Sequence, residues 1–202
     1  MGGQILIVSG PSGSGKSTLI ERLMKEENNI YFSISSTTRK IRAGEKDDVN
    51  YHYISVSDFE KGIKEGEFLE YAVVHKNYYG TSIKPVLAAL EAGKSVIFDI
   101  DVQGFDIVRK KFDEEITSVF ITTKTKNELE KRLKKRGSND EKDIERRLYN
   151  AAIEMQHIKD YDYFLINDDL ANSYRAFKAI FRSMKFKTKN LNVAQIAENW
   201  ID

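Results

Sequence analysis

The chain has no cysteine and only two prolines among its 202 residues. Without cysteine there is no disulfide scaffold and no cysteine-based metal site, and the composition fits a reducing compartment. A dominant charge is missing as well, since 32 Lys and Arg stand against 31 Asp and Glu. A basic field over the whole protein, which nucleic-acid binding favours, is therefore excluded.

Long apolar stretches are also absent. No apolar run approaches the roughly 20 residues that a membrane span needs. The N-terminal residues lack the basic leader and long apolar core of a signal peptide. With 41% apolar and 31% charged residues, we expect a soluble, cytoplasmic protein of one or two domains, without a membrane or nucleic-acid partner.

Short apolar runs recur along the chain and predict strands buried on both faces of a sheet. They lie at 4–9, 95–98, 118–121 and 163–166. A helix should begin at Ser17, and helical segments separate the later runs. This alternation predicts an α/β fold with a parallel sheet and crossover helices.

The stretch 33–81 departs from this alternation. It is rich in Ser, Thr and Tyr, and has β-prone segments at 51–54 and 68–74. Between them, Ser57 to Glu60 form a capping-box pattern, which should start a short helix. We interpret this stretch as a small, mostly β insertion on the α/β core.

Dense charges of both signs at helical spacing mark a second unusual region, 124–147. On charge alone it is a solvated helical hairpin. Two apolar stripes near the end predict helices that pack on the core; they are Tyr174, Phe177, Ile180, Phe181 and Met184, then Val193, Ile196, Ala197 and Trp200. The predicted core is thus 1–32, 82–123 and 151–202, with the insertion at 33–81 and the hairpin at 124–150.

A glycine-rich segment between the first strand and the first helix matches the phosphate-binding P-loop pattern. It reads Gly10, Pro11, Ser12, Gly13, Ser14, Gly15, Lys16 and Ser17, followed by Thr18. Backbone N–H groups and the helix N-terminus should bind the phosphates, Lys16 should reach the β- and γ-phosphates, and Ser17 should hold Mg²⁺. A GTPase, an ATPase, a kinase or a transporter subunit all remain open at this point.

Two arginines narrow the choice of acceptor. Arg39 and Arg42 lie three residues apart among hydroxyl side chains. Such a pair suits an acceptor that is itself a phosphate, because each guanidinium can hold two oxygens. A hydroxyl acceptor would need a positioned carboxylate base, and the sequence context of a protein-kinase catalytic loop is absent.

The motifs taken together resemble those of the guanylate kinase family. They follow the family's order at 9–17, 33–45, 77–81, 99–104, 136–137 and 167–169, which covers nearly the whole chain. The resemblance implies transfer of the γ-phosphate of ATP to GMP, and to dGMP, with Mg²⁺ as cofactor and no obligatory protein partner. It makes 33–81 the GMP-binding domain and 124–150 a lid over ATP.

The resemblance also assigns the acceptor site. Arg39, Arg42, Tyr51 and Tyr79 would hold the GMP phosphate, while Ser35, Glu70 and Thr81 would read the guanine, with Gly80 and Asp101 also at the acceptor nucleotide. The chemistry of guanine agrees on Glu70, because a carboxylate accepts from both its N1–H and its amino group. Taken alone, Glu70 would more often be a solvent-facing strand residue.

The remaining candidates lie on the ATP side. Asp99 follows the strand at 95–98, where it would contact Mg²⁺ through water or fix an arginine. The resemblance implies that lid residues Arg132, Arg136 and Arg147 neutralise the transferring phosphoryl group. It places Asn167 near the adenine. His52, His75 and His157 are interpreted as structural or surface residues.

Two alternatives are weighed against this function. Another nucleoside monophosphate kinase, for AMP or UMP, is disfavoured by Glu70, Ser35 and Thr81. A non-catalytic protein-binding module related to guanylate kinases is disfavoured because the P-loop, Lys16 and the arginines are intact.

Overall fold

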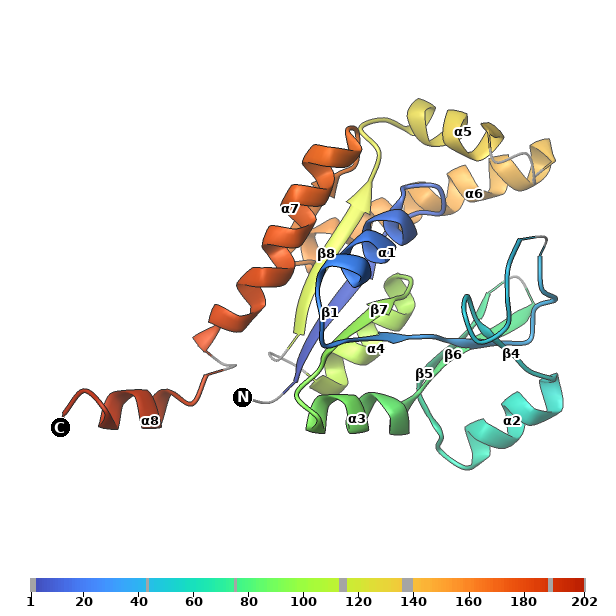
Figure 1. The fold of residues 1–202 in the computed structure, drawn as a ribbon. Helices are drawn as coiled ribbons and strands as arrows, with labels where there is room; N and C mark the ends of the chain where they lie inside the picture. Colours follow the sequence, from blue (N-terminus) through green and yellow to red (C-terminus); the bar gives the residue numbers. More distant parts are fainter. Residues whose placement is uncertain are drawn as a thin grey trace.

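The computed structural model describes residues 3–42, 44–74, 76–112, 116–135, 140–188 and 191–201. Its centre is a five-stranded sheet of order β2-β7-β1-β8-β9, in which all neighbours are parallel (Figure 1). The strands are β1 (Gln4–Ser9), β2 (Ile30–Ser33), β7 (Ser95–Asp99), β8 (Ile116–Thr122) and β9 (Tyr163–Ile166). The predicted α/β fold is confirmed.

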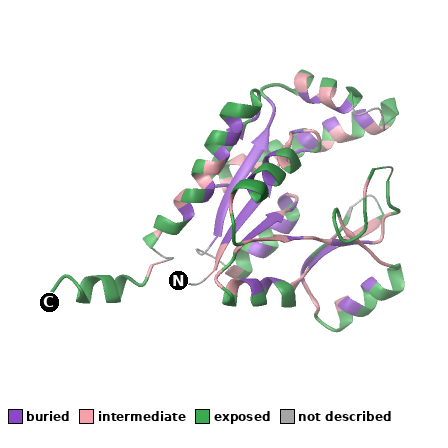
Figure 2. Ribbon diagram, in the orientation of Figure 1, coloured by how far each residue is buried: buried purple, intermediate pink, exposed green. Residues whose placement is uncertain are grey.

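Helices cover both faces of this sheet, because its strands are apolar on both sides. In β1, Ile5 and Ile7 pack with residues of α3 (Ile83–Glu91) and α4 (Val102–Phe112). Their neighbours Leu6 and Val8 face the opposite way, into a cluster with the helices α1 (Lys16–Glu26) and α7 (Leu170–Ser183). Figure 2 shows the resulting buried centre.

A second, smaller sheet of order β4-β3-β6-β5 is inserted after the first crossover. It consists of β3 (Ser36–Thr37), β4 (His52–Tyr53), β5 (Phe68–Val74) and β6 (Asn77–Ser82), with helix α2 (Val56–Lys64). Phe59 of α2 stacks on Phe68 and Tyr78, with ring centroids 4.3 and 4.9 Å apart. These aromatic contacts attach the helix to the sheet, as the predicted β insertion requires.

The sequence patterns missed some details of these elements. The cap of α2 is Ser55, whose side chain accepts from the Asp58 N–H, so the predicted start at Ser57 is wrong by two residues. The strands β2, β3 and β6 were not predicted. β3 and β6 consist mostly of polar residues and tyrosines and so lack an apolar run, whereas Ile30, Tyr31 and Phe32 of β2 form a short apolar run that was overlooked.

The charged region forms the predicted helical hairpin, with α5 (Lys126–Lys135), α6 (Glu141–Glu154) and the 3₁₀ segment η2 (Met155–Asp160). Its two helices have their own apolar cluster, made by Leu129, Leu133, Ile144, Leu148 and Ala151. Asp140 caps α6 by accepting from the Asp143 N–H. Crossing a bilayer would need a longer and more apolar helix than any among the described residues.

The C-terminal part confirms one apolar stripe and corrects another. Tyr174, Phe177 and Phe181 of α7 are buried against the sheet, and η3 (Met184–Phe186) continues this contact through Met184. The short helix α8 (Val193–Glu198) instead projects away from the core (Figure 1). Its predicted packing is wrong, since Trp200 is 87% exposed, and α1 and α7 already cover the adjacent sheet face.

The last strand is also less buried than predicted. In β9 only Leu165 is buried, whereas Phe164 and Ile166 are 45% and 39% exposed. The reason is its place at the edge of the sheet, where it pairs with β8 alone.

Candidate active site

The P-loop joins β1 to α1, as predicted, and its backbone requires glycine at two points. Gly10 and Gly15 have φ angles of 136° and 94°, which L-residues rarely adopt. A Cβ on Gly10 would lie 2.0 Å from the Ile121 carbonyl oxygen, and one on Gly15 would lie 2.3 Å from Asn167 Nδ2. The chain therefore passes close to its neighbours here, and any larger residue would push the loop out of place.

The N-terminus of α1 is arranged to receive an anion. Its cap residue is Gly15, and no side chain accepts from the first-turn N–H groups. Lys16 Nζ folds back over the loop and donates to the carbonyl oxygens of Gly10 and Pro11 at 2.5 and 3.4 Å. The loop thus combines uncapped helix donors with an ammonium group, which together suit the phosphates of a nucleotide.

A carboxylate borders the lysine. Asp99 ends β7, and its Oδ1 lies 3.9 Å from Lys16 Nζ. Burial raises the pKa of Asp99, while the charge of Lys16 opposes this rise. Ser17 and Thr18 are exposed at the start of α1. Among the described residues, no three His, Asp or Glu side chains form a metal site by themselves. Ser17 and Asp99 are two of the side chains beside the loop that carry oxygen donors.

A cavity of about 300 Å³ lies between the P-loop, α5 and the segment that joins β9 to α7. Its lining is Gly13, Gly15, Thr18, Arg132, Asn167, Asp168 and Leu170. Asn167 is 5% exposed, and its Nδ2 donates to the Ser14 carbonyl oxygen at 2.7 Å. The side-chain amide of Asn167 therefore donates to the P-loop, and Asn167 lies at the wall of the cavity. The sequence predicted that this residue lies near the adenine of ATP.

Arg39 lies in a cluster with tyrosines and a carboxylate, on the insertion. Its Nε donates to Tyr79 Oη at 3.1 Å, and its Nη1 and Nη2 donate to the two oxygens of Glu45 at 3.0 Å each. The ring of Tyr51 lies edge-on to Tyr79, with centroids 5.7 Å apart. The structure thus brings together three predicted phosphate ligands, and it adds Glu45, to which no role had been assigned.

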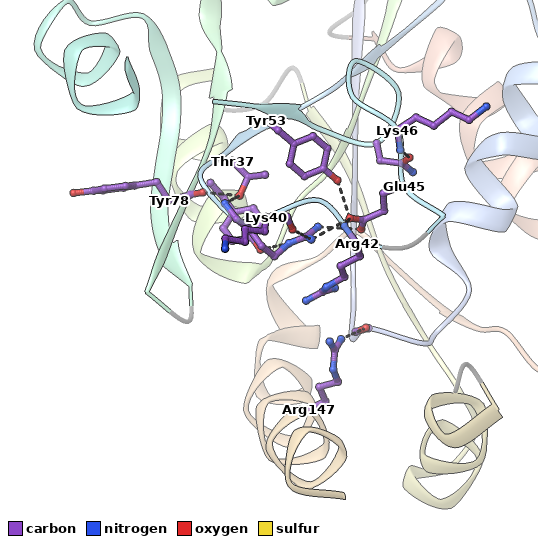
Figure 3. A network of polar contacts seen from close by, with 12 residues as sticks. Thr37, Lys40, Arg42, Glu45, Lys46, Tyr53, Tyr78 and Arg147 are labelled. Carbon is purple, nitrogen blue, oxygen red and sulfur yellow. Dashed lines mark hydrogen bonds and ion pairs between the residues drawn. The ribbon is translucent and has the colours of Figure 1, made fainter. Parts of the chain in front are cut away.

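Figure 3 shows how Glu45 connects this cluster to Arg42 and Tyr53. The Arg42 backbone N–H and the Tyr53 hydroxyl both donate to Glu45 Oε2 at 2.8 Å. Burial by itself would raise the pKa of Glu45, but the donors from Arg39, Arg42 and Tyr53 lower it to about 2. Glu45 is therefore ionised at neutral pH, whereas the Arg42 side chain remains exposed.

The predicted guanine-reading residues form a chain of contacts at the junction of the insertion and the core. The hydroxyls of Ser35 and Thr81 are 3.2 Å apart, and Thr81 Oγ1 donates to Glu70 Oε1 at 2.7 Å. Glu70 is 7% exposed. Burial raises its pKa to about 7, helped by the nearby charge of Asp101 and opposed by the Thr81 hydrogen bonds.

Two other residues predicted at the acceptor nucleotide have structural contacts. Asp101 Oδ1 accepts from the backbone N–H groups of Gln103 and Gly104 at 3.1 and 2.9 Å, which caps α4. Gly80 is buried in β6, where a Cβ would lie 2.8 Å from the ring of Phe59. Gly80 therefore permits the close packing of α2 on the small sheet.

The hairpin arginines that the structure describes reach the P-loop. Arg132 Nη1 donates to the Ser14 carbonyl oxygen at 3.3 Å, and its Nη2 donates to the Asn167 carbonyl oxygen at 2.6 Å. Arg147 Nη1 donates to Ser12 Oγ at 2.8 Å (Figure 3). Arg136 lies outside the described residues. Both helices of the hairpin thus contact the P-loop through an arginine.

Comparison with known proteins decides the family. The sequence model of the family described as guanylate kinase matches residues 2–184. The chain belongs to the guanylate kinase family. It is 55% identical to the guanylate kinase of Campylobacter jejuni (strain RM1221) over 201 residues, which cover 99% of this chain and 98% of that protein. With the guanylate kinase of Helicobacter pylori (strain ATCC 700392 / 26695) it shares 46% over 196 residues, covering 97% and 95%.

A solved guanylate kinase has a similar structure. The crystal structure of the enzyme from Anaplasma phagocytophilum matches with a TM-score of 0.79 at 30% identity, covering 98% of this chain and 95% of that one. The resemblance stated from the motifs is thereby confirmed at the level of family and fold.

Some contacts of this guanylate kinase family site were not predicted. Glu45 lies within the motif at 33–45, three residues after Arg42, and this short spacing was the only sign in the sequence of a contact between Glu45 and the arginines. Asp143, which accepts from Arg147 Nε at 2.8 Å, shows the i, i+4 spacing of a helical ion pair and could have been found that way. His52 and His157 lie beside Asp48 and Asp160, as structural or surface residues, and His75 lies outside the described residues.

Proposed function

We propose that this chain transfers the γ-phosphoryl group of ATP to GMP, and to dGMP, giving ADP and GDP or dGDP. The observation that carries the proposal is the buried carboxylate of Glu70, held by Thr81 beside the Ser35 hydroxyl. Guanine offers two adjacent donors that one carboxylate accepts together, and hydroxyls can donate to its O6. Adenine would present a lone pair to Glu70, which disfavours AMP.

The donor nucleotide is assigned to the P-loop and its cavity. The loop 10–18 would bind the phosphates of ATP through backbone N–H groups, with Lys16 released from the Gly10 and Pro11 carbonyls to reach them. Asn167 would act from behind the loop, by fixing the Ser14 carbonyl.

Magnesium fits the residues beside this loop. An exposed serine hydroxyl and a carboxylate are the hard oxygen donors that Mg²⁺ prefers, so Ser17 and Asp99 would hold it, the latter through water. Bound with ATP, the ion would supply positive charge that offsets the charge of the phosphates.

The acceptor phosphate is assigned to Arg39, Arg42, Tyr51 and Tyr79. An oxygen of the GMP phosphate attacks the γ-phosphorus, and the bond from that phosphorus to the bridging oxygen of ADP breaks. The attacking oxygen is already ionised at neutral pH, so no general base is needed. Catalysis then depends on alignment and on neutralising charge.

We assign the chain to three parts: a core of 1–32, 82–123 and 151–202, a GMP-binding domain of 33–81, and a lid of 124–150. The contacts of Arg132 and Arg147 with the P-loop support a lid that covers ATP and excludes water. Arg136 is proposed as the third lid cation from the sequence alone. The cytoplasmic location and the lack of an obligatory protein partner likewise stay predictions from the sequence.

A coupled ADP-release assay with ATP·Mg²⁺ against GMP, dGMP, AMP and UMP tests the function. We expect turnover of GMP and dGMP, with kcat/KM for AMP lower by a factor of about 10³ or more. Comparable turnover of AMP would refute guanine reading by Glu70. No turnover with any acceptor would favour a non-catalytic binding module.

A further inference from the structure

Glu45 is the common partner of four donors from three places in the chain. Both Nη groups of Arg39 donate to it at 3.0 Å, and the Arg42 N–H and the Tyr53 hydroxyl donate at 2.8 Å (Figure 3). The side chains of Arg39 and Glu45 are only 11% and 21% exposed. A bidentate pair with this degree of protection is stronger and more rigid than an ion pair on the surface.

The guanidinium of Arg39 has few donors left for a ligand. Of its five N–H groups, Nε–H is used on Tyr79 Oη, and the two on Nη1 are used on the Lys40 carbonyl oxygen and Glu45. One on Nη2 is used on Glu45. Within the described part of the chain, a single Nη2 N–H therefore remains for an acceptor phosphate.

We infer that Glu45 is a positioning residue for the acceptor phosphate. It holds Arg39 in one orientation with its charge paired, so that Arg39 offers one N–H beside the Tyr79 hydroxyl. The exposed side chain of Arg42 has no ion pair within the described part of the chain, so Arg42 then supplies the free positive charge and the bidentate hold. This inference rests on the proposed function and assigns different tasks to two arginines that the sequence treats alike.

The variant Glu45→Gln keeps the size of the side chain and removes its charge. It replaces one oxygen by an amide NH₂, which faces the donors of Arg39, Arg42 or Tyr53. We expect KM for GMP to rise about tenfold or more, with a smaller change in kcat and an unchanged KM for ATP. Affinity for guanosine, which has no phosphate, should stay within about twofold.

Two further variants separate positioning from general damage. Because Glu45 acts through Arg39, the Glu45→Gln effect on KM for GMP should shrink to under about threefold in an Arg39→Lys background. Tyr53→Phe removes one of the four donors and keeps the ring, so it should raise KM for GMP by a smaller factor. The matched control is Glu65→Gln, which removes the same charge from the exposed Lys61 pair of α2, at 3.8 Å, and should change nothing.

Equilibrium binding of GMP and guanosine, measured by calorimetry alongside the kinetics, tests Glu45 even without turnover. Equal or tighter GMP binding by Glu45→Gln would overturn the inference, since Glu45 would then merely compete with the phosphate. A parallel loss of guanosine affinity would also overturn it, because it indicates a disrupted domain. A wild-type protein that binds GMP without phosphorylating it would instead contradict the proposed function and leave the positioning role of Glu45 supported by the binding difference.

Discussion

The Thr81 hydroxyl donates a 2.7 Å hydrogen bond to Glu70, which is buried where the small sheet meets the core. A carboxyl group in such a place, with few donors and Asp101 nearby, ionises less readily than in water. Guanine would supply the missing donors. Binding of the base and ionisation of Glu70 are therefore expected to be coupled.

The variant Glu70→Gln tests whether Glu70 recognises the guanine base. We expect kcat/KM for GMP to fall about 100-fold, because an amide cannot accept from both guanine donors. AMP turnover should fall far less. The ratio of the two kcat/KM values measures the effect, and an unchanged ratio would remove Glu70 from the specificity site.

The same residue predicts a pH-dependent KM for GMP. The pKa of Glu70 is raised to about 7 by burial, so it becomes protonated as the pH falls below 7. At pH 6 about a tenth of the protein would have the ionised form, and KM for GMP should rise about tenfold over its value at pH 8. The GMP phosphate also titrates near pH 6. Glu70→Gln is the control, because it keeps the phosphate titration and should lose the step near pH 7.

Stability should respond to pH with the opposite sign from that of a salt-bridged carboxylate. The pKa of Glu70 is about 7 in the folded state, above its ordinary value of 4.5, so between these two pH values the folded state binds more protons than the unfolded state. The contribution of Glu70 to the free energy of unfolding is fully present below pH 4.5. It falls by up to about 3 kcal/mol as the pH rises through 7. Glu70→Gln should therefore be more stable than the wild type at pH 8 and closer to it at pH 4.5. Melting temperatures at both pH values test this, and a constant difference between the two proteins would contradict it.

Arg39→Lys should lower kcat/KM for GMP about 100-fold while KM for ATP stays the same. An ammonium group cannot contact Tyr79, both oxygens of Glu45 and a phosphate at once. Arg22→Lys, on the exposed face of α1 beside Glu26, is the matched control and should leave both constants unchanged. Unchanged kinetics for Arg39→Lys would rule out its role at the acceptor phosphate.

Asn167→Ala should weaken the binding of ATP and leave the binding of GMP unchanged. It removes the shorter of the two hydrogen bonds to the buried Ser14 carbonyl, the other coming from Arg132, and should destabilise the protein by about 1 kcal/mol. The P-loop is then less fixed, so KM for ATP should rise several-fold while KM for GMP remains constant. Thermal melting and the two KM values test this together. A higher KM for GMP with a normal KM for ATP would contradict a role of Asn167 on the ATP side.

Features that depend on neighbouring residues could be predicted from the sequence. The P-loop could be predicted because its glycines, the strand before it and the helix after it are consecutive, and φ angles such as that of Gly10 exclude side chains locally. The continuous apolar runs of the inner strands likewise predicted a parallel sheet covered on both faces. The family motifs then supplied the positions that are proposed for the site residues.

Which of these residues contact one another depends on how the whole chain packs. Ser35 and Thr81 lie 46 residues apart, and Arg132 lies 118 residues from Ser14, so no local pattern fixes their contacts. The burial of Glu70, and with it the raised pKa, follows from packing of the insertion against the core. Helix α8 shows the opposite outcome. Its apolar stripe predicted burial, but the stripe is exposed because α1 and α7 already cover the nearby face of the sheet. Patterns of apolar and polar residues specify what a segment can form, whereas the partners of each side chain depend on contacts that close only when the chain has folded.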